Sequence, residues 1–372
     1  MPSRLLAASA AFLLFAALTL ASASDLDAVL AKAMDGTQTP ALAVLEMRDG
    51  KIAQEAVRGV RRNDRFDLAK ISDVWATGSD GKPMTAALIA KLVDRGVLSW
   101  NTPLSKMLPD LAETMRPEYR TVTLIQLLSH RSGLPQDTSD LAFFATFFTD
   151  ARSLPQQRLA YISRALTEAP AVAPDSAFSY SNTGFIVAAV IAERATRSSY
   201  EDLMRREVFQ PLGMASAKFA ATHDGQPRGH RAGKPVTAAY VKADDGNPLM
   251  FAPAGGELHL SLRDWAQFCL DQMAGAQGHG KLLTAASYHL MQTDPHGGNA
   301  AVGWGVQDAI GGRKGPVLLH LGSDANWYAV VVLFPKSGTG ALVAANAADD
   351  MGGDKAVTAA LGALLPNLSP AK

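Results

Sequence analysis

Strand-like segments lie near both ends of this chain, and the residues between them read mostly as helices. Residues 41–59 form an apolar strand, a tight Asp-Gly turn and a returning strand. Near the other end, 327–334 and 341–346 are strand-like and are joined by a turn. Two such pairs, far apart in the sequence, predict one sheet that the two termini build together. A mostly helical region, about residues 79–235, would then be inserted between the two parts of the sheet.

This order of elements predicts an α+β fold, an α/β sandwich in which helices flank an antiparallel sheet. The first clear helix carries Met84, Leu88 and Leu92 at a spacing of four residues, and Gly96 ends it. The chain contains no internal repeat, no low-complexity linker and no block of like charge. We therefore expect residues 24–372 to form a single domain.

The first 23 residues have the order of a secretory signal peptide. Arg4 and the amino terminus precede an apolar run over 5–20, and the Ala-Ser-Ala triplet 21–23 resembles a cleavage site. The run is shorter than the roughly 20 residues of a membrane-spanning helix, and no basic stop-transfer cluster follows it. We expect a bacterial-type exported protein, periplasmic or secreted, with no stable membrane anchor after signal cleavage.

Composition excludes several classes of function. The 35 basic and 35 acidic residues balance, so no net positive field favours nucleic acid. Cys269 is the only cysteine, which excludes an internal disulfide, and its helical segment 262–269 predicts a buried thiol. The eight histidines form no His-x-His or His-x-x-x-His pair, so a metallohydrolase has little support. We expect no metal and no cofactor.

Ser79 and Lys82 stand three residues apart at the start of the first clear helix. A serine hydroxyl is a weak nucleophile until a base removes its proton, and a lysine with a lowered pKa can be that base. The helix N-terminus adds backbone N–H groups that could stabilise an oxyanion. On spacing alone, however, Ser79 is more simply read as a helix N-cap.

Two further motifs could carry chemistry. Tyr180 and Asn182 flank one residue before an apolar helix, and they could relay a proton and bind an acyl amide; the plain alternative is a turn whose asparagine caps that helix. His320 and Gly322 would share one face of a strand edge, where glycine allows a substrate backbone to approach. The Ser323 N–H would then be an oxyanion donor together with that of Ser79. The plain alternative for His320 is a partly exposed strand histidine.

The order Ser-x-x-Lys, Tyr-x-Asn, His-x-Gly resembles the serine hydrolases of the β-lactamase and penicillin-binding-protein superfamily. The nearest likeness is to class C β-lactamases, D-Ala-D-Ala carboxypeptidases and their esterase relatives. Supporting segments with the same likeness are 75–78, 96–104, 127–135, 211–214, 254–258 and 303–305. The resemblance covers about residues 40–347 and implies a β-lactamase/transpeptidase-like fold.

The resemblance also implies roles for the motif residues. Ser79 would be the acylated nucleophile, Lys82 its base or base partner, and Tyr180 the group that moves a proton to the leaving group and activates the deacylating water. Asn182 would hold the acyl amide of the substrate, and His320 would line the pocket and interact with a carboxylate or with the tyrosine oxygen.

Departures from the family pattern bear on the substrate. The third motif, at His320, lacks the lysine and threonine of true β-lactamases, which favours a carboxypeptidase or an esterase. Gly81 stands where family members usually carry a side chain. Segment 136–170, with its four phenylalanines, would roof the cleft, or those aromatic rings would simply pack in the core.

We therefore expect an exported serine hydrolase that forms an acyl-enzyme on amide or ester carbonyls of a D-amino-acid peptide, an ester or a β-lactam. The alternative is a protein of the same fold that binds β-lactams or peptidoglycan fragments with little turnover. The expected partner is a small-molecule or peptide substrate and not a nucleic acid. The sequence leaves the physiological substrate and the oligomeric state open.

Overall fold

A computed structural model describes residues 25–220, 225–236 and 246–368 of the chain. The predicted signal peptide, residues 1–23, lies outside the described residues. Within the described ranges, no helix is both long enough and apolar enough to cross a membrane.

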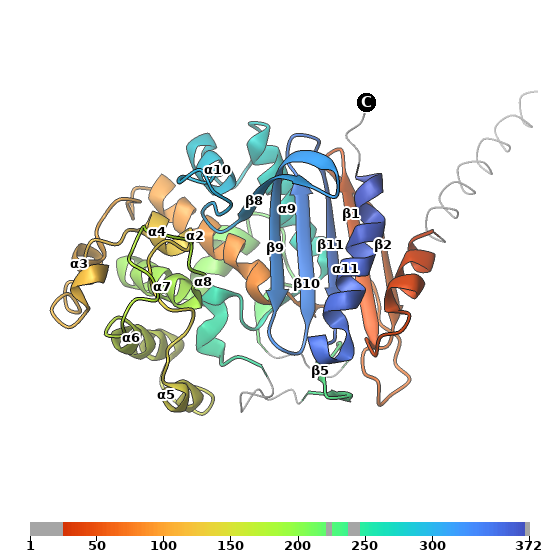
Figure 1. The fold of residues 1–372 in the computed structure, drawn as a ribbon, viewed down its shortest axis with the longest axis horizontal. Helices are drawn as coiled ribbons and strands as arrows, with labels where there is room; N and C mark the ends of the chain where they lie inside the picture. Colours follow the sequence, from red (N-terminus) through yellow and green to blue (C-terminus); the bar gives the residue numbers. More distant parts are fainter. Residues whose placement is uncertain (1–24, 221–224, 237–245, 369–372) are drawn as a thin grey trace, which may run out of the picture.

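A six-stranded antiparallel sheet forms one half of the molecule, and both ends of the chain contribute to it (Figure 1). Its strand order is β2-β1-β11-β10-β9-β8. The strands are β1 (Ala41–Arg48), β2 (Lys51–Gly59), β8 (Gly305–Ile310), β9 (Arg313–Ser323), β10 (Tyr328–Phe334) and β11 (Thr339–Ala345). β1 pairs directly with β11, with Val44 opposite Val343. The predicted α+β fold with an antiparallel sheet built from both termini is confirmed.

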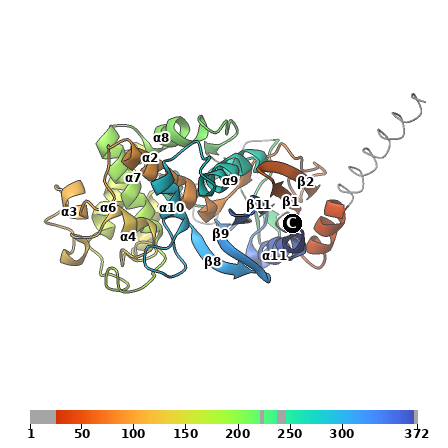
Figure 2. The same ribbon diagram turned by 90° about the horizontal axis from the view of Figure 1, so that it is seen from above.

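Helices cover both faces of this sheet (Figure 2). The central strands β10 and β11 are buried almost throughout, and alternate side chains point to opposite faces. Val330 and Val332 pack with α11 (Gly353–Leu364) and the helix over residues 25–34, whereas Ala329 and Val331 belong to the larger core on the side of α9 (Leu262–Ala276). Cys269 is buried in α9 as predicted, and burial raises the pKa of its thiol.

Most of the residues between β2 and β8 form a mostly helical half beside the sheet (Figure 1), whereas α9 from the same stretch covers one face of the sheet. Its helices are α2 (Lys82–Asp94), α3 (Leu104–Met107), α4 (Leu124–Leu128), α5 (Leu141–Thr146), α6 (Leu154–Ala165), α7 (Asn182–Thr196), α8 (Tyr200–Met204) and α10 (Ala285–Gln292). The apolar helix α7 is buried on nearly all sides and packs against α2, α4 and α6. A small sheet of β3 (Trp75–Ala76), β7 (Leu258–Leu260) and β4 (Lys218–Phe219), which the sequence did not predict, contacts the large sheet where β3 meets β11.

Candidate active site

Ser79 lies in a short 3₁₀ turn, η1 (Gly78–Gly81), that leads from β3 directly into α2. Gly78 has a φ of +52°, which turns the chain sharply ahead of Ser79. The cap positions of η1 and α2 are Thr77 and Gly81, so Ser79 is not a helix cap. Its Oγ instead accepts two hydrogen bonds, from Lys82 Nζ at 2.9 Å and from the Tyr180 hydroxyl at 2.7 Å. The turn therefore places the Ser79 hydroxyl within hydrogen-bond distance of Lys82 from the same motif and of Tyr180 from the second motif.

Lys82 is completely buried at the first position of α2. Besides Ser79, its Nζ donates a hydrogen bond of 2.6 Å to the Ala254 carbonyl and lies 4.9 Å from the centre of the Tyr180 ring. Burial lowers the pKa of Lys82 to about 7, although the carboxylates of Asp137 and Asp80 act in the opposite direction. About half of the lysine is then a neutral amine at neutral pH, which can accept the serine proton.

Tyr180 reaches Ser79 from the segment before α7, and its ring stacks on His130 with ring centres 4.5 Å apart. Burial raises the pKa of Tyr180 to about 12, so the phenol stays protonated at neutral pH. His130 has a positive φ of 58°, and its Nδ1 accepts a hydrogen bond from the Ser181 N–H. Because burial holds the pKa of His130 well below its usual value, this ring supports Tyr180 as a neutral group.

Asn182 is the first residue of α7, but it does not cap the helix. The cap is Ser181, whose hydroxyl accepts a hydrogen bond from the Gly184 N–H. The carboxamide of Asn182 is free to point elsewhere, and its Nδ2 donates to Asp137 Oδ1 at 3.0 Å. Asp137 was not among the residues singled out from the sequence.

Gly322 brings the edge of β9 into contact with the turn that carries Ser79. A Cβ at Gly322 would lie 1.8 Å from the Thr77 carbonyl oxygen, and a Cβ at Gly78 would lie 2.6 Å from the Ser323 nitrogen. The close approach that Gly322 permits is therefore to the protein's own backbone and not, as expected, to a substrate backbone. It places the Ser323 N–H beside η1, on the same cleft as Ser79.

His320 points from the same face of β9 toward Asp80, the residue that follows Ser79. Its Nδ1 lies 3.2 Å from Asp80 Oδ1 and 3.0 Å from the Leu321 carbonyl oxygen. Burial, with a further contribution from Lys82, lowers the pKa of His320 to about 3, and burial raises the pKa of Asp80. His320 is therefore neutral at pH 7, and its polar contacts are to Asp80 and not to Tyr180.

The contact at Gly322 gives a prediction for stability. Gly322→Ala places a methyl group against the Thr77 carbonyl, and we expect it to lower the free energy of unfolding by about 2 kcal/mol or more in urea denaturation. Gly362→Ala on the exposed side of α11 is the control, since its Cβ meets nothing within 4 Å and alanine favours a helix. An unchanged unfolding free energy for Gly322→Ala would contradict this packing.

A cleft of about 330 Å³ opens at Ser79. Its lining comprises Gly78, Ser79, Gln136, Asp137, Thr138, Leu141, Phe144, Asn182, Gly246, Asn247, Phe251, Ala254, Gly256, Ser323, Asp324 and Ala325. Segment 136–170 therefore supplies one wall through its first residues and Phe144, whereas Phe147 is buried in the core. A larger hollow near Phe209 and Met214 contains none of the motif residues.

Close packing next to this cleft explains why position 81 is a glycine. A Cβ at Gly81 would lie 2.9 Å from the Gly255 Cα, so the turn after Ser79 is pressed against the loop that contains Gly255. A side chain at this position, as family members usually carry, would require that loop to move.

The family model described as Beta-lactamase matches residues 26–364, which is nearly all of the described chain and includes every motif above. The chain belongs to the β-lactamase family. The predicted membership in the superfamily of β-lactamases and penicillin-binding proteins is thereby confirmed.

Individual relatives of this β-lactamase-family protein are distant. It is 23% identical over 337 residues to Protein flp of Staphylococcus aureus (strain N315), covering 88% of this chain and 64% of that protein. The chain thus spans less than two thirds of the length of that relative. It is 27% identical over 326 residues to Penicillin-binding protein 4 of Amycolatopsis lactamdurans, covering 82% of this chain and 81% of the relative.

Among solved structures, the octameric penicillin-binding protein homologue from Pyrococcus abyssi superposes with a TM-score of 0.73 at 22% identity. The superposition covers 93% of this chain and 78% of the Pyrococcus abyssi chain. At this level of identity the likeness supports the β-lactamase-family fold.

Three polar residues around the site of this β-lactamase-family protein could not be assigned from the sequence. Asp80, His130 and Asp137 contact His320, Tyr180 and Asn182 respectively. Two of them carried a partial signal, because His130 lies in a family-like segment and Asp137 in the segment expected to roof the cleft. Asp80 stands inside the Ser-x-x-Lys motif, but nothing in its spacing indicates a contact with β9.

Proposed function

We propose that this chain is an exported serine hydrolase that acts on ester or amide carbonyls through an acyl-enzyme at Ser79. The observation that carries the proposal is the pair of hydrogen bonds that Ser79 Oγ accepts from Lys82 and Tyr180. A buried lysine with a lowered pKa, a protonated tyrosine and a serine at the mouth of a cleft are the groups that acyl transfer requires. Membership in a family whose members include serine enzymes with a Ser-x-x-Lys motif supports it.

In the proposed steps, protons move among the side chains of Ser79, Lys82 and Tyr180, and each side chain regains its starting state at the end of the cycle. Ser79 Oγ attacks the carbonyl carbon while its proton passes to the neutral amine of Lys82. The Tyr180 hydroxyl gives its proton to the leaving group and recovers one from the lysine. Water then attacks the acyl-enzyme, loses a proton through the same groups, and Ser79 is released with its hydroxyl restored.

Two backbone N–H groups, those of Ser79 and Ser323, would stabilise the negative oxygen that forms at the carbonyl. The close contact between the Gly78 turn and Ser323 supports this pairing. The steps use no metal or cofactor. A neutral His320 offers no positive charge to a substrate carboxylate, which favours an ester substrate over a β-lactam.

Export is the second part of the proposal and rests on the pattern of residues 1–23, with a basic start, an apolar run and small residues at the cleavage position. The mature protein would then act in the periplasm or outside the cell.

The test is a side-by-side panel of a p-nitrophenyl ester, a D-Ala-D-Ala peptide and a chromogenic cephalosporin, with intact-mass measurement after mixing. We expect turnover of the ester or the peptide and a transient adduct of the acyl mass on Ser79. A long-lived adduct without product release on every substrate would indicate a binding protein with little turnover. Activity that a chelator removes but Ser79→Ala retains would contradict the serine mechanism.

A further inference from the structure

Asp137 and Asn182 both line the cleft and contact each other. Asn182 Nδ2 donates to Asp137 Oδ1 at 3.0 Å, and since a carboxylate only accepts, this contact identifies which amide atom is the nitrogen. One amide hydrogen is thereby used within the protein. The Gln136 side chain, which lines the same cleft, also forms a hydrogen bond with Asp137. A carboxylate has about four acceptor sites, so Asp137 can still accept a hydrogen bond from a substrate donor.

The charged residues that line the cleft also favour a substrate that brings hydrogen-bond donors. Among the lining residues that the structure describes, the ionisable side chains are the carboxyl groups of Asp137 and Asp324, and none is a lysine, arginine or histidine. Lys82, whose positive charge acts to lower the pKa of Asp137, is buried beside Ser79 and hydrogen-bonded to it. An anionic group in this cleft would be repelled, whereas an ammonium group would be attracted.

Asp137 itself lacks a cationic partner at contact distance. None of the described residues forms an ion pair with it within 4.0 Å, although the carboxyl group is only partly exposed. Burial raises the pKa of Asp137, which means that the charged form is disfavoured in the free protein. A bound ammonium would offset that cost.

We propose that the acyl part of the substrate carries a protonated amino group that binds Asp137 and the Asn182 carbonyl oxygen. The substrates would be aminoacyl esters or amides with a free amine. The inference rests on the proposed function, since it uses Asn182 as the residue beside the acyl chain. An α-amino group stands two bonds from the carbonyl carbon that Ser79 attacks, and Ser79, Asn182 and Asp137 line one cleft.

The experiment compares alanine methyl ester with N-acetylalanine methyl ester, each as both enantiomers, by acid release at pH 7, where an α-amino group is mostly protonated. We expect the free amine to be preferred at least about tenfold in kcat/KM for one enantiomer, a size in keeping with one charge-assisted hydrogen bond. In Asp137→Asn the ratio of the two kcat/KM values should fall to about 1, whatever the absolute rates.

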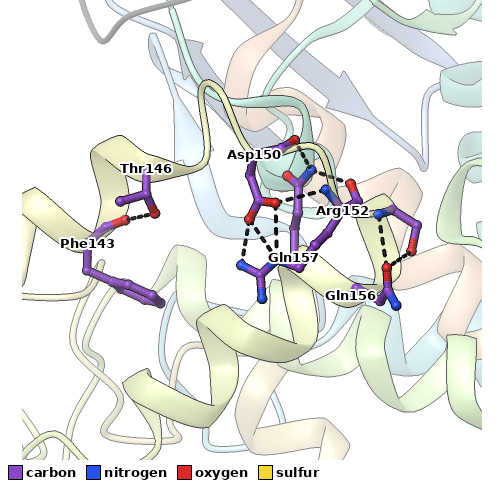
Figure 3. Close-up of polar contacts among 7 residues, drawn as sticks. Phe143, Thr146, Asp150, Arg152, Gln156 and Gln157 are labelled. Atoms are coloured by element: carbon purple, nitrogen blue, oxygen red, sulfur yellow. Dashed lines mark hydrogen bonds and ion pairs between the residues drawn. The ribbon is translucent and has the colours of Figure 1, made fainter.

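Asp150→Asn is the matched control. It removes a carboxylate from the same 136–170 segment, but Asp150 pairs with Arg152 outside the cleft lining (Figure 3). This variant should keep the preference of the wild type for the free amine.

Two results would overturn the inference. They are a wild type that hydrolyses both esters equally or prefers the acetylated one, and an Asp137→Asn variant that keeps the wild-type ratio. An equal loss of both rates in Asp137→Asn would show instead that Asp137 acts on Lys82. If no ester is hydrolysed and no adduct forms on Ser79, the proposed function fails, and the inference fails with it.

Discussion

Ser79→Ala is expected to lower kcat by at least about 10⁴-fold on any substrate that the wild type turns over. The hydroxyl that Lys82 and Tyr180 both contact is then gone, and no other group in the described cleft lining stands between those two side chains. The acyl adduct expected by intact mass in the wild type should be absent from this variant. Both readouts, steady-state rate and mass, are needed, because a loss of rate alone does not locate the covalent bond.

Ser176→Ala is a suitable control for this variant. Ser176 is exposed, and its hydroxyl donates only to the Ala173 carbonyl within its own turn. It should leave rate and labelling as in the wild type. A Ser79→Ala protein that still becomes acylated would move the nucleophile to another residue and remove the basis of the proposed mechanism.

Lys82→Arg is expected to lower kcat/KM by about 10³-fold, because an arginine keeps the positive charge but does not lose a proton near neutral pH. A role for Lys82 as charge alone would predict a small effect. Lys91→Arg on the same helix is the control, since Lys91 bonds the Leu282 carbonyl away from the cleft. Equal activity of Lys82→Arg and the wild type would contradict a proton-accepting lysine.

The pH dependence of kcat/KM in the wild type should also reflect the proton-accepting role proposed for Lys82. The pKa of Lys82 is lowered to about 7, so the neutral amine predominates above this pH and falls about tenfold for each unit below it. We therefore expect kcat/KM to rise with pH up to about 7 and then to level off. Tyr180, with its pKa raised to about 12, stays protonated throughout this range. A rise that continues to pH 10 would show that Lys82 titrates like an ordinary surface lysine.

Much of the fold could be predicted because its strongest signals are local. β1, β10 and β11 are continuous apolar runs bounded by turns, and their burial on both faces is what such runs indicate. β8 escaped prediction because it is an outer strand with exposed polar residues such as Asp308, and its sequence resembles a loop. The two-residue strands β3 and β4 are too short to show a pattern.

The residues of the candidate site likewise include some that the sequence could predict and some that it could not. Ser79, Lys82 and Tyr180 belong to motifs that can be read from neighbouring residues, and the structure brings these three together. Asp80 acquires its partner only because η1 packs under β9, and Asp137 acquires its partner only because the loop after α4 folds back on α7. Contacts of this kind depend on the packing of distant segments, which no local pattern describes.

The pairing of β1 with β11 has a consequence for folding during synthesis of the chain. During synthesis the segment with Ser79 emerges long before β9 and Ser323, so the nucleophile exists for most of that time without its proposed oxyanion partner. Non-local pairing of this kind also slows folding, because a long loop must close before its contacts form. A nascent chain is therefore expected to be hydrolytically silent until its last strands arrive. Under the proposed function, an exported hydrolase would therefore gain its activity only when the whole sheet has assembled.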